Sequence, residues 1–146
     1  MKGPARICPP RPRTGYKDTV PHVPGARRYR EISILTATPG QLTIVLHDGA
    51  IAALREAAAH VATGDVGQRT RAVRRALAIL AELQGALDFG ADAELAESLT
   101  RQYVYMAQRV FEGNLSQRAE PLVEVAELLE TLRDGWVDAV NPPRDG

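Results

Sequence analysis

The sequence predicts an all-α protein, an antiparallel four-helix bundle with a disordered or loosely docked N-terminal arm. Three observations support this fold class. Apolar residues recur with a period of about 3.6 residues over four segments of roughly 20 residues each. Capping residues precede these segments, and glycines or prolines follow them. The connections span about two to eight residues, a length that favours antiparallel neighbours.

The first helix is predicted at about residues 39–62 because its start carries a complete capping signal. Thr38 can act as the N-cap, Pro39 fits the first helical position, and Gln41 stands three residues after Thr38. Gly64 then supplies a left-handed stop. The apolar stripe of this helix consists of Leu42, Val45, Leu46, Ala50, Ala53, Leu54, Ala57 and Val61.

The second and third helices each follow an aspartate that can accept from the free amides of a helix start. Asp65 predicts a helix at about 66–87, and Asp92 predicts one at about 93–112 that ends at Gly113.

The fourth helix is predicted at about 120–140. Pro121 opens its leucine-rich stripe, and Pro142 and Pro143 forbid its continuation.

The chain divides into an arm at 1–28, a helical bundle at 29–140 and a short tail at 141–146. Residues 1–30 hold six of the ten prolines, eight Lys or Arg and one Asp, a net charge of +7, so the remainder carries −7. Proline fixes φ and lacks an amide proton, so no persistent helix or central strand is expected in the arm. Cys8 is the single cysteine, which excludes an intramolecular disulfide and favours a reducing compartment.

Reaction chemistry has little support in the sequence. His47 and Asp48 are adjacent, but neighbours on a helix point about 100° apart and do not form a catalytic pair. A groove-lining or helix-surface histidine is the favoured interpretation. Glu56 and His60 have one residue too many between them for a bundle metal motif, and no second copy exists. We therefore expect no enzyme activity, no metal and no cofactor.

Two charged patterns are interpreted as solvated helix faces. One is an arginine cluster without interleaved aromatic residues, which argues against nucleic-acid binding; the other is an acidic stripe on the last helix. Apolar surface in the first helix and around Tyr103 and Tyr105 exceeds what two neighbouring helices would cover, although core packing alone explains it equally well. The arginines are Arg69, Arg71, Arg74 and Arg75, and the acids are Glu120, Glu124, Glu127, Glu130, Asp134 and Asp138.

Five motifs in register resemble the FliS family of flagellar secretion chaperones over about residues 29–138. The first two are Tyr29 followed by "ILTATPGQL" (34–42), and "LHDGAI" (46–51). The later ones are "LD" (87–88) with "ELAESL" (94–99), "YVYM" (103–106) and "LRDGW" (132–136). His47 stands where the family pattern usually has tyrosine, and Gln102 where it has leucine.

The resemblance implies a cytoplasmic export chaperone with a four-helix bundle. It would bind the disordered C-terminal segment of flagellin, prevent premature polymerisation and aid delivery to the flagellar type III export gate. We expect no nucleic-acid partner and no membrane insertion, and a homodimer is a possible state. The flagellin-binding residues carried over from the motifs are Tyr29, Ile34, Leu42, Leu46, His47, Tyr103 and Met106.

One alternative from another functional class follows from the charge asymmetry. The basic arm could bind an acidic partner or nucleic acid while the bundle serves as a scaffold, which makes the protein a non-enzymatic helical adaptor.

Overall fold

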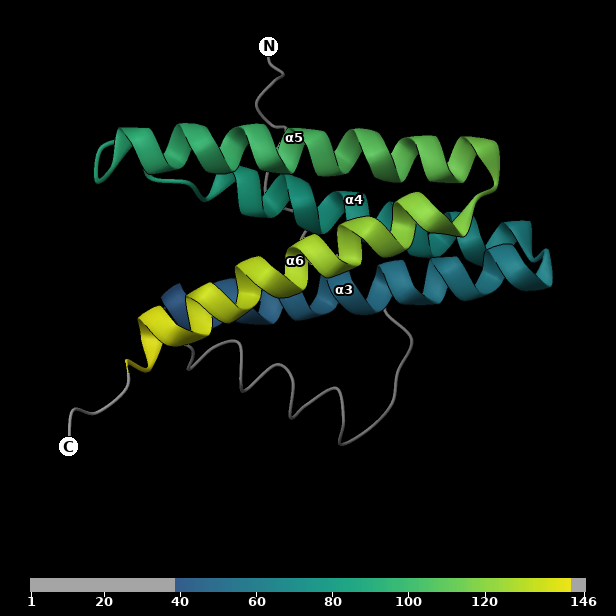
Figure 1. Ribbon diagram of the computed structural model, residues 1–146, viewed down its shortest axis with the longest axis horizontal. Helices are drawn as coiled ribbons and strands as arrows, with labels where there is room; N and C mark the ends of the chain where they lie inside the picture. The colour runs from purple at the N-terminus through teal and green to yellow at the C-terminus, as the bar shows by residue number, and fades with distance from the viewer. Residues whose placement is uncertain (1–38, 143–146) are drawn as a thin grey trace, which may run out of the picture. The chain divides into compact units, whose positions relative to one another are not determined.

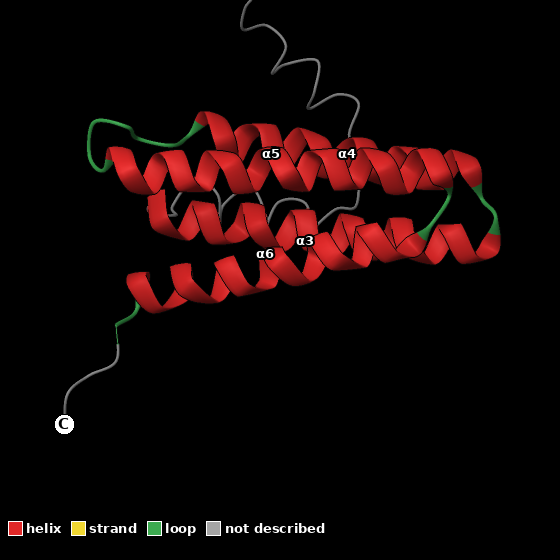
Figure 2. Ribbon diagram, turned by 45° about the horizontal axis from the view of Figure 1, so that its top comes forward, coloured by secondary structure: helices red, strands yellow, loops and turns green. Residues whose placement is uncertain are grey.

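The computed structural model describes residues 39–142, and every regular element in that range is an α-helix. The helices are α3 (Pro39–Thr63), α4 (Val66–Gly85), α5 (Ala93–Ser116) and α6 (Ala119–Val140). Successive helices run in opposite directions, as Figures 1 and 2 show. The predicted all-α, antiparallel four-helix bundle is therefore confirmed. The arm, Tyr29, Ile34 and the predicted cap Thr38 lie outside the described residues.

The helices form a ring in which α3 packs against α4 and α6, and α5 completes the ring against the same two helices. The backbone of α3 approaches its neighbours more extensively than that of α5 does. Small side chains explain the close approach, because α3 and α4 present buried alanines to the core. These are Ala50, Ala53 and Ala57 on α3, and Ala72 and Ala76 on α4.

The α5 and α6 helices fill the rest of the core with larger side chains. Each buried leucine, valine or methionine contributes roughly 1.5–3 kcal/mol relative to exposure. The main core side chains of these two helices are Leu99, Tyr103, Met106 and Val110 on α5, and Leu122, Val125 and Leu129 on α6. Within residues 39–142, no helix is both long enough and apolar enough to cross a membrane.

The predicted caps of α4 and α5 are confirmed. The Asp65 carboxylate accepts from the amide of Gln68 at 3.1 Å, and the Asp92 carboxylate accepts from the amide of Leu95 at 3.0 Å. Gly64 has a φ of 76°, which confirms the left-handed stop after α3. Each aspartate satisfies one amide that the helix itself leaves free, a contribution of about 1 kcal/mol.

Two predicted helix ends are wrong. The α4 helix ends at Gly85 rather than near residue 87, and α5 runs through Gly113 to Ser116. Gln117 ends α5 instead, with a left-handed φ of 56°. Gly113 lies inside the helix and is buried, because the chain entering α6 passes directly over it.

Gly113→Ala should destabilise the protein, although a helical Gly→Ala change ordinarily stabilises by about 0.5–1 kcal/mol. An added Cβ would lie 3.1 Å from the carbonyl oxygen of Arg118 and 3.1 Å from a methyl of Leu122. We expect the free energy of unfolding in urea to fall by about 1–3 kcal/mol. Gly135→Ala is the matched control, since no atom comes within 4 Å of its added Cβ. Equal gains in both variants would contradict this assignment.

Candidate functional site

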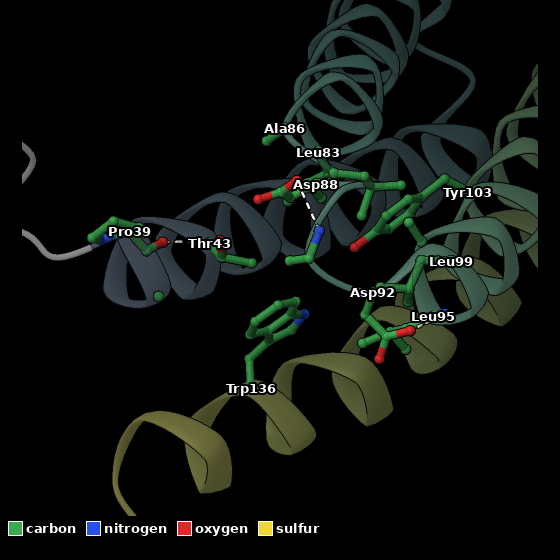
Figure 3. Close-up of a pocket in the computed structure, with 14 residues that line it drawn as sticks. Pro39, Thr43, Leu83, Ala86, Asp88, Asp92, Leu95, Leu99, Tyr103 and Trp136 are labelled. Carbon is green, nitrogen blue, oxygen red and sulfur yellow. Dashed lines mark hydrogen bonds between the residues drawn. The ribbon is translucent and has the colours of Figure 1, made fainter.

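An apolar cavity of about 280 Å³ opens at the end of the bundle where α3 begins and the chain turns from α4 to α5. We call it the end pocket (Figure 3). It is lined by Pro39, Gly40, Thr43, Leu83, Ala86, Leu87, Asp88, Ala91, Asp92, Leu95, Ala96, Leu99, Tyr103 and Trp136. Leu95 stands half in solvent, with 51% of its surface exposed. The pocket therefore offers apolar walls to a partner's side chain.

Turns and caps shape the rim of the end pocket. The carboxylate of Asp88 accepts from the amides of Gly90 and Ala91 at 3.0 and 3.2 Å, which holds the turn after α4. Asp92 caps α5 and places Leu95 in its first turn. Both aspartates thus use a side-chain oxygen to fix the backbone beside the opening.

A buried polar chain runs behind the end pocket and joins α3 to α5. The Thr43 carbonyl lies 2.8 Å from Nδ1 of His47 and can only accept, so Nδ1 carries the proton. Nε2 of His47 then accepts from the Tyr103 hydroxyl at 3.2 Å. Trp136 of α6 lines the same pocket as Tyr103. Figure 3 shows Tyr103 and Trp136 on facing sides of the pocket.

Burial sets the protonation state of this chain. It lowers the pKa of His47 below 6.5, an effect larger than the opposing hydrogen bond to Thr43. Burial also raises the pKa of Tyr103 to about 12, and the contact with Trp136 offsets this only in part. Both groups are therefore neutral near pH 7.

The structure brings only some of the predicted site residues together. His47 and Tyr103 are hydrogen bonded, while Leu42 and Leu46 lie half-buried along the first half of α3. His47 has 0% exposed surface, so the prediction of a groove-lining or helix-surface histidine is wrong. Tyr103 and Met106 are also core residues, each 1% exposed, and reach pockets only as parts of their floors.

Met106 belongs to a second cavity of about 280 Å³ between α5 and α6, which we call the side pocket. Its lining residues are Ser98, Arg101, Gln102, Tyr105, Met106 and Leu128. A wider hollow of about 630 Å³ extends over Leu77, Ala107 and Phe111. All three cavities border α5, so this helix is the common wall of the candidate binding surfaces.

Exposed apolar residues gather on α5 rather than on α3, where the sequence had placed much of the surplus. Five large apolar side chains of α5 are exposed, compared with Val45 alone on α3. Three of these side chains, Val104, Phe111 and Leu115, are spaced so that they form a second apolar stripe on α5, next to the stripe that is buried in the core. The five are Leu95, Val104, Tyr105, Phe111 and Leu115.

The acidic stripe of α6 is more than a solvated face. Glu124 accepts from Arg109 at 2.8 Å and from the Tyr105 hydroxyl at 2.5 Å, and Glu130 accepts from Arg55 at 2.9 Å. The hydrogen bond from Tyr105 contributes most to the lowered pKa of Glu124. These exposed pairs orient α6 against α5 and α3 but contribute little to stability, because solvent screens them.

The four arginines of the α4 cluster differ in their burial. Arg71, Arg74 and Arg75 are exposed as predicted, but Arg69 is only 6% exposed. Its guanidinium donates to the side-chain oxygen of Asn114 at 2.9 Å and to the Asn114 carbonyl at 3.4 Å. Arg69 therefore caps the carbonyl end of α5, where the helix dipole favours a cation.

No catalytic dyad forms at His47. The Asp48 carboxylate pairs with Arg133 of α6 at 2.5 Å, while both ring nitrogens of His47 have other partners. Across residues 39–142, no three His, Cys, Asp or Glu side chains gather closely enough to hold a metal ion.

Comparisons with known proteins identify relatives over most of the chain. The family model described as "Flagellar protein FliS" matches residues 23–143. The flagellar secretion chaperone FliS of Bacillus subtilis (strain 168) is 31% identical over 116 residues, covering 80% of this chain and 86% of that protein. The protein of the same name from Salmonella typhimurium (strain LT2) is 32% identical over 117 residues, covering 77% and 87%. Flagellar secretion chaperone FliSB of Pseudomonas aeruginosa is 31% identical over 114 residues, covering 75% and 90%.

Proposed function

Because this chain belongs to the FliS family of flagellar proteins, we propose that it is a cytoplasmic export chaperone for flagellin. In this proposal it binds the disordered C-terminal segment of flagellin, prevents premature polymerisation and aids delivery to the flagellar type III export gate. It acts by binding alone, without an enzymatic step.

The observation that carries the proposal is the apolar surface of α5. A folded bundle with no further partner has little reason to expose Leu95 and Phe111, which keep 51% and 59% of their surfaces in solvent. The end pocket and the side pocket border the same helix. Together they suit an amphipathic segment that anchors a few apolar side chains while its polar face stays in water.

The energies agree with reversible capture. A disordered segment that folds on binding incurs an ordering cost of about 2–5 kcal/mol. Burial of one large apolar side chain returns roughly 1.5–3 kcal/mol. Three or four anchors therefore exceed the ordering cost and still leave an affinity from which the cargo can be released at the export gate.

The end pocket is the anchor site that we favour. It is lined by Tyr103, one of the carried-over residues, and by Trp136 from the "LRDGW" motif. Tyr29 and Ile34 remain proposed contacts that lie outside the described residues. Leu42, Leu46, His47 and Met106 are proposed to act through the packing of the pocket walls, since His47 and Met106 are buried and Leu42 and Leu46 are half-buried.

Titration calorimetry with a peptide of the flagellin C-terminal segment tests the proposal. We expect binding at tens of micromolar or tighter, both for the full chain and for a variant that lacks residues 1–28. The adaptor alternative predicts that removal of the basic arm abolishes the main contact with an acidic partner. Absence of peptide binding by the full chain would overturn the chaperone proposal. Sedimentation of the same samples would report whether a homodimer forms.

A further inference from the structure

His47 is an ionisable side chain in the centre of the bundle, and the flagellin-binding proposal makes no use of its proton. It has no exposed surface, and both of its ring nitrogens have partners. We propose that His47 is a positioning residue: its neutral ring holds Tyr103 and Trp136 in place as walls of the end pocket, and one proton taken up at Nε2 releases them.

The direction of the hydrogen bonds makes the position sensitive to that proton. The Thr43 carbonyl fixes the hydrogen on Nδ1, which leaves the lone pair of Nε2 to accept from the Tyr103 hydroxyl. The donors thus run from the Tyr103 hydroxyl of α5 through the His47 ring of α3 to a backbone carbonyl, and Trp136 of α6 lines the pocket together with Tyr103.

Protonation of His47 reverses one link of this chain. A proton on Nε2 turns the acceptor into a donor, so the Tyr103 hydroxyl loses its acceptor inside the core. The Tyr103 hydroxyl must then turn its hydrogen away from the ring, and in this proposal Trp136, which lines the same pocket, responds to the change. The imidazolium also carries a charge into a site without solvent contact. The lost hydrogen bond and the buried charge both destabilise the packing around the end pocket.

The charged neighbours do not compensate for this charge. Asp48, on the same helix, favours the charged ring, and Arg133, from α6, opposes it; these two side chains are ion-paired with each other at 2.5 Å. Tyr103 is the titratable group that faces the ring from α5, and no group of α4 contributes to the shift. Burial is therefore the dominant cause of the lowered pKa of His47.

Low pH should destabilise the folded protein through His47. The folded state holds the proton of His47 more weakly than the unfolded chain does, since the folded pKa lies below 6.5. The stabilisation by the neutral ring is thus complete above pH 6.5 and is lost as the pH falls through the folded pKa. A tyrosine at this position, as in the family pattern, would not titrate in that range. The proton response is therefore specific to chains with histidine here.

Trp136 is the single tryptophan of the chain and a wall of the end pocket, so its fluorescence reports the proposed movement. We expect the emission of the full chain to change reversibly as the pH falls below 6.5 and one proton binds. His47→Gln should abolish this step. His60→Gln, a change to a partly exposed histidine on the same helix, should retain it. Asp88 and Asp92, which also line the pocket, are present in all three proteins.

A second variant decides the outcome if His47→Gln fails to fold. Tyr103→Phe removes the hydroxyl through which the proton acts on the pocket wall, so the emission step should be lost although His47 is still present. Unchanged wild-type emission below pH 6.5 while the protein stays folded, an undiminished step in a folded His47→Gln protein, or an undiminished step in Tyr103→Phe would each overturn the proposal. None of these measurements uses flagellin, so their failure is separate from failure of the chaperone proposal.

Discussion

Leu95→Asp should weaken the binding of a flagellin C-terminal peptide at least tenfold in titration calorimetry. Leu95 lines the mouth of the end pocket and is 51% exposed, so a bound apolar side chain would cover it. The change removes roughly 1.5–3 kcal/mol of potential apolar burial and requires a carboxylate to lose water on binding. A tenfold loss corresponds to about 1.4 kcal/mol, so the expected effect is at the lower end of these costs.

Leu115→Asp provides the matched control for this experiment. Leu115 is on the same helix and is 72% exposed, but it lines none of the three cavities described above. We expect its affinity to stay within about threefold of the wild type, a difference below 0.7 kcal/mol. Both residues are exposed, so neither variant should lose its helical circular dichroism. Equal losses of affinity would move the anchor site from the end pocket to the whole outer face of α5.

Helix positions were predictable from the sequence because their signals are local. Asp65, Asp92 and Gly64 act on amides and dihedral angles within a few residues, so their roles follow from neighbouring letters. The end of α5 was not predictable in this way. A glycine at position 113 resembles a helix stop signal, but this residue packs against Arg118 and Leu122, which follow the turn after α5. Its role depends on how α6 returns over α5, which local rules do not contain.

The helical spacing of His47 predicted that it is buried, but its polar side chain suggested the opposite. His47 lies three, seven and ten residues before Ala50, Leu54 and Ala57, which are buried on the same face of α3. Its period thus assigned it to the core, whereas its polarity suggested a surface. The partner that makes the burial acceptable, Tyr103, lies 56 residues away on the diagonally opposite helix. Only the assembled bundle shows that both ring nitrogens are satisfied.

The candidate site was predictable as a family property but not as a geometry. The motif residues Tyr103 and Met106 mark the right helix, yet they form floors rather than exposed contacts. The outer stripe of Val104, Phe111 and Leu115 has the same period as the core stripe and differs from it only in direction. Which stripe faces inward is settled by the neighbours of α5, and α4 and α6 cover only one of the two.

Arg69→Met should lower the free energy of unfolding in urea by about 1.5–3 kcal/mol, the range for a hydrogen bond to a charged group. Methionine retains much of the buried stem but leaves the Asn114 side-chain oxygen and carbonyl without the guanidinium. Since these acceptors belong to the last turns of α5, amide hydrogen exchange should accelerate at residues 113–117 in particular. The effect combines lost hydrogen bonds with the loss of a cation at a helix C-terminus.

Arg74→Met separates this capping role from the general loss of positive charge on α4. Arg74 is exposed on the same helix, and the change in charge and shape is identical. Substitutions at such positions usually alter stability by no more than about 0.5 kcal/mol. A large loss in Arg69→Met beside a small one in Arg74→Met would place the arginine's contribution in its contact with the end of α5. Similar values for the two variants would mean that burial of Arg69 is incidental, and that Gln117 and the crossing of α6 over Gly113 hold the turn without it.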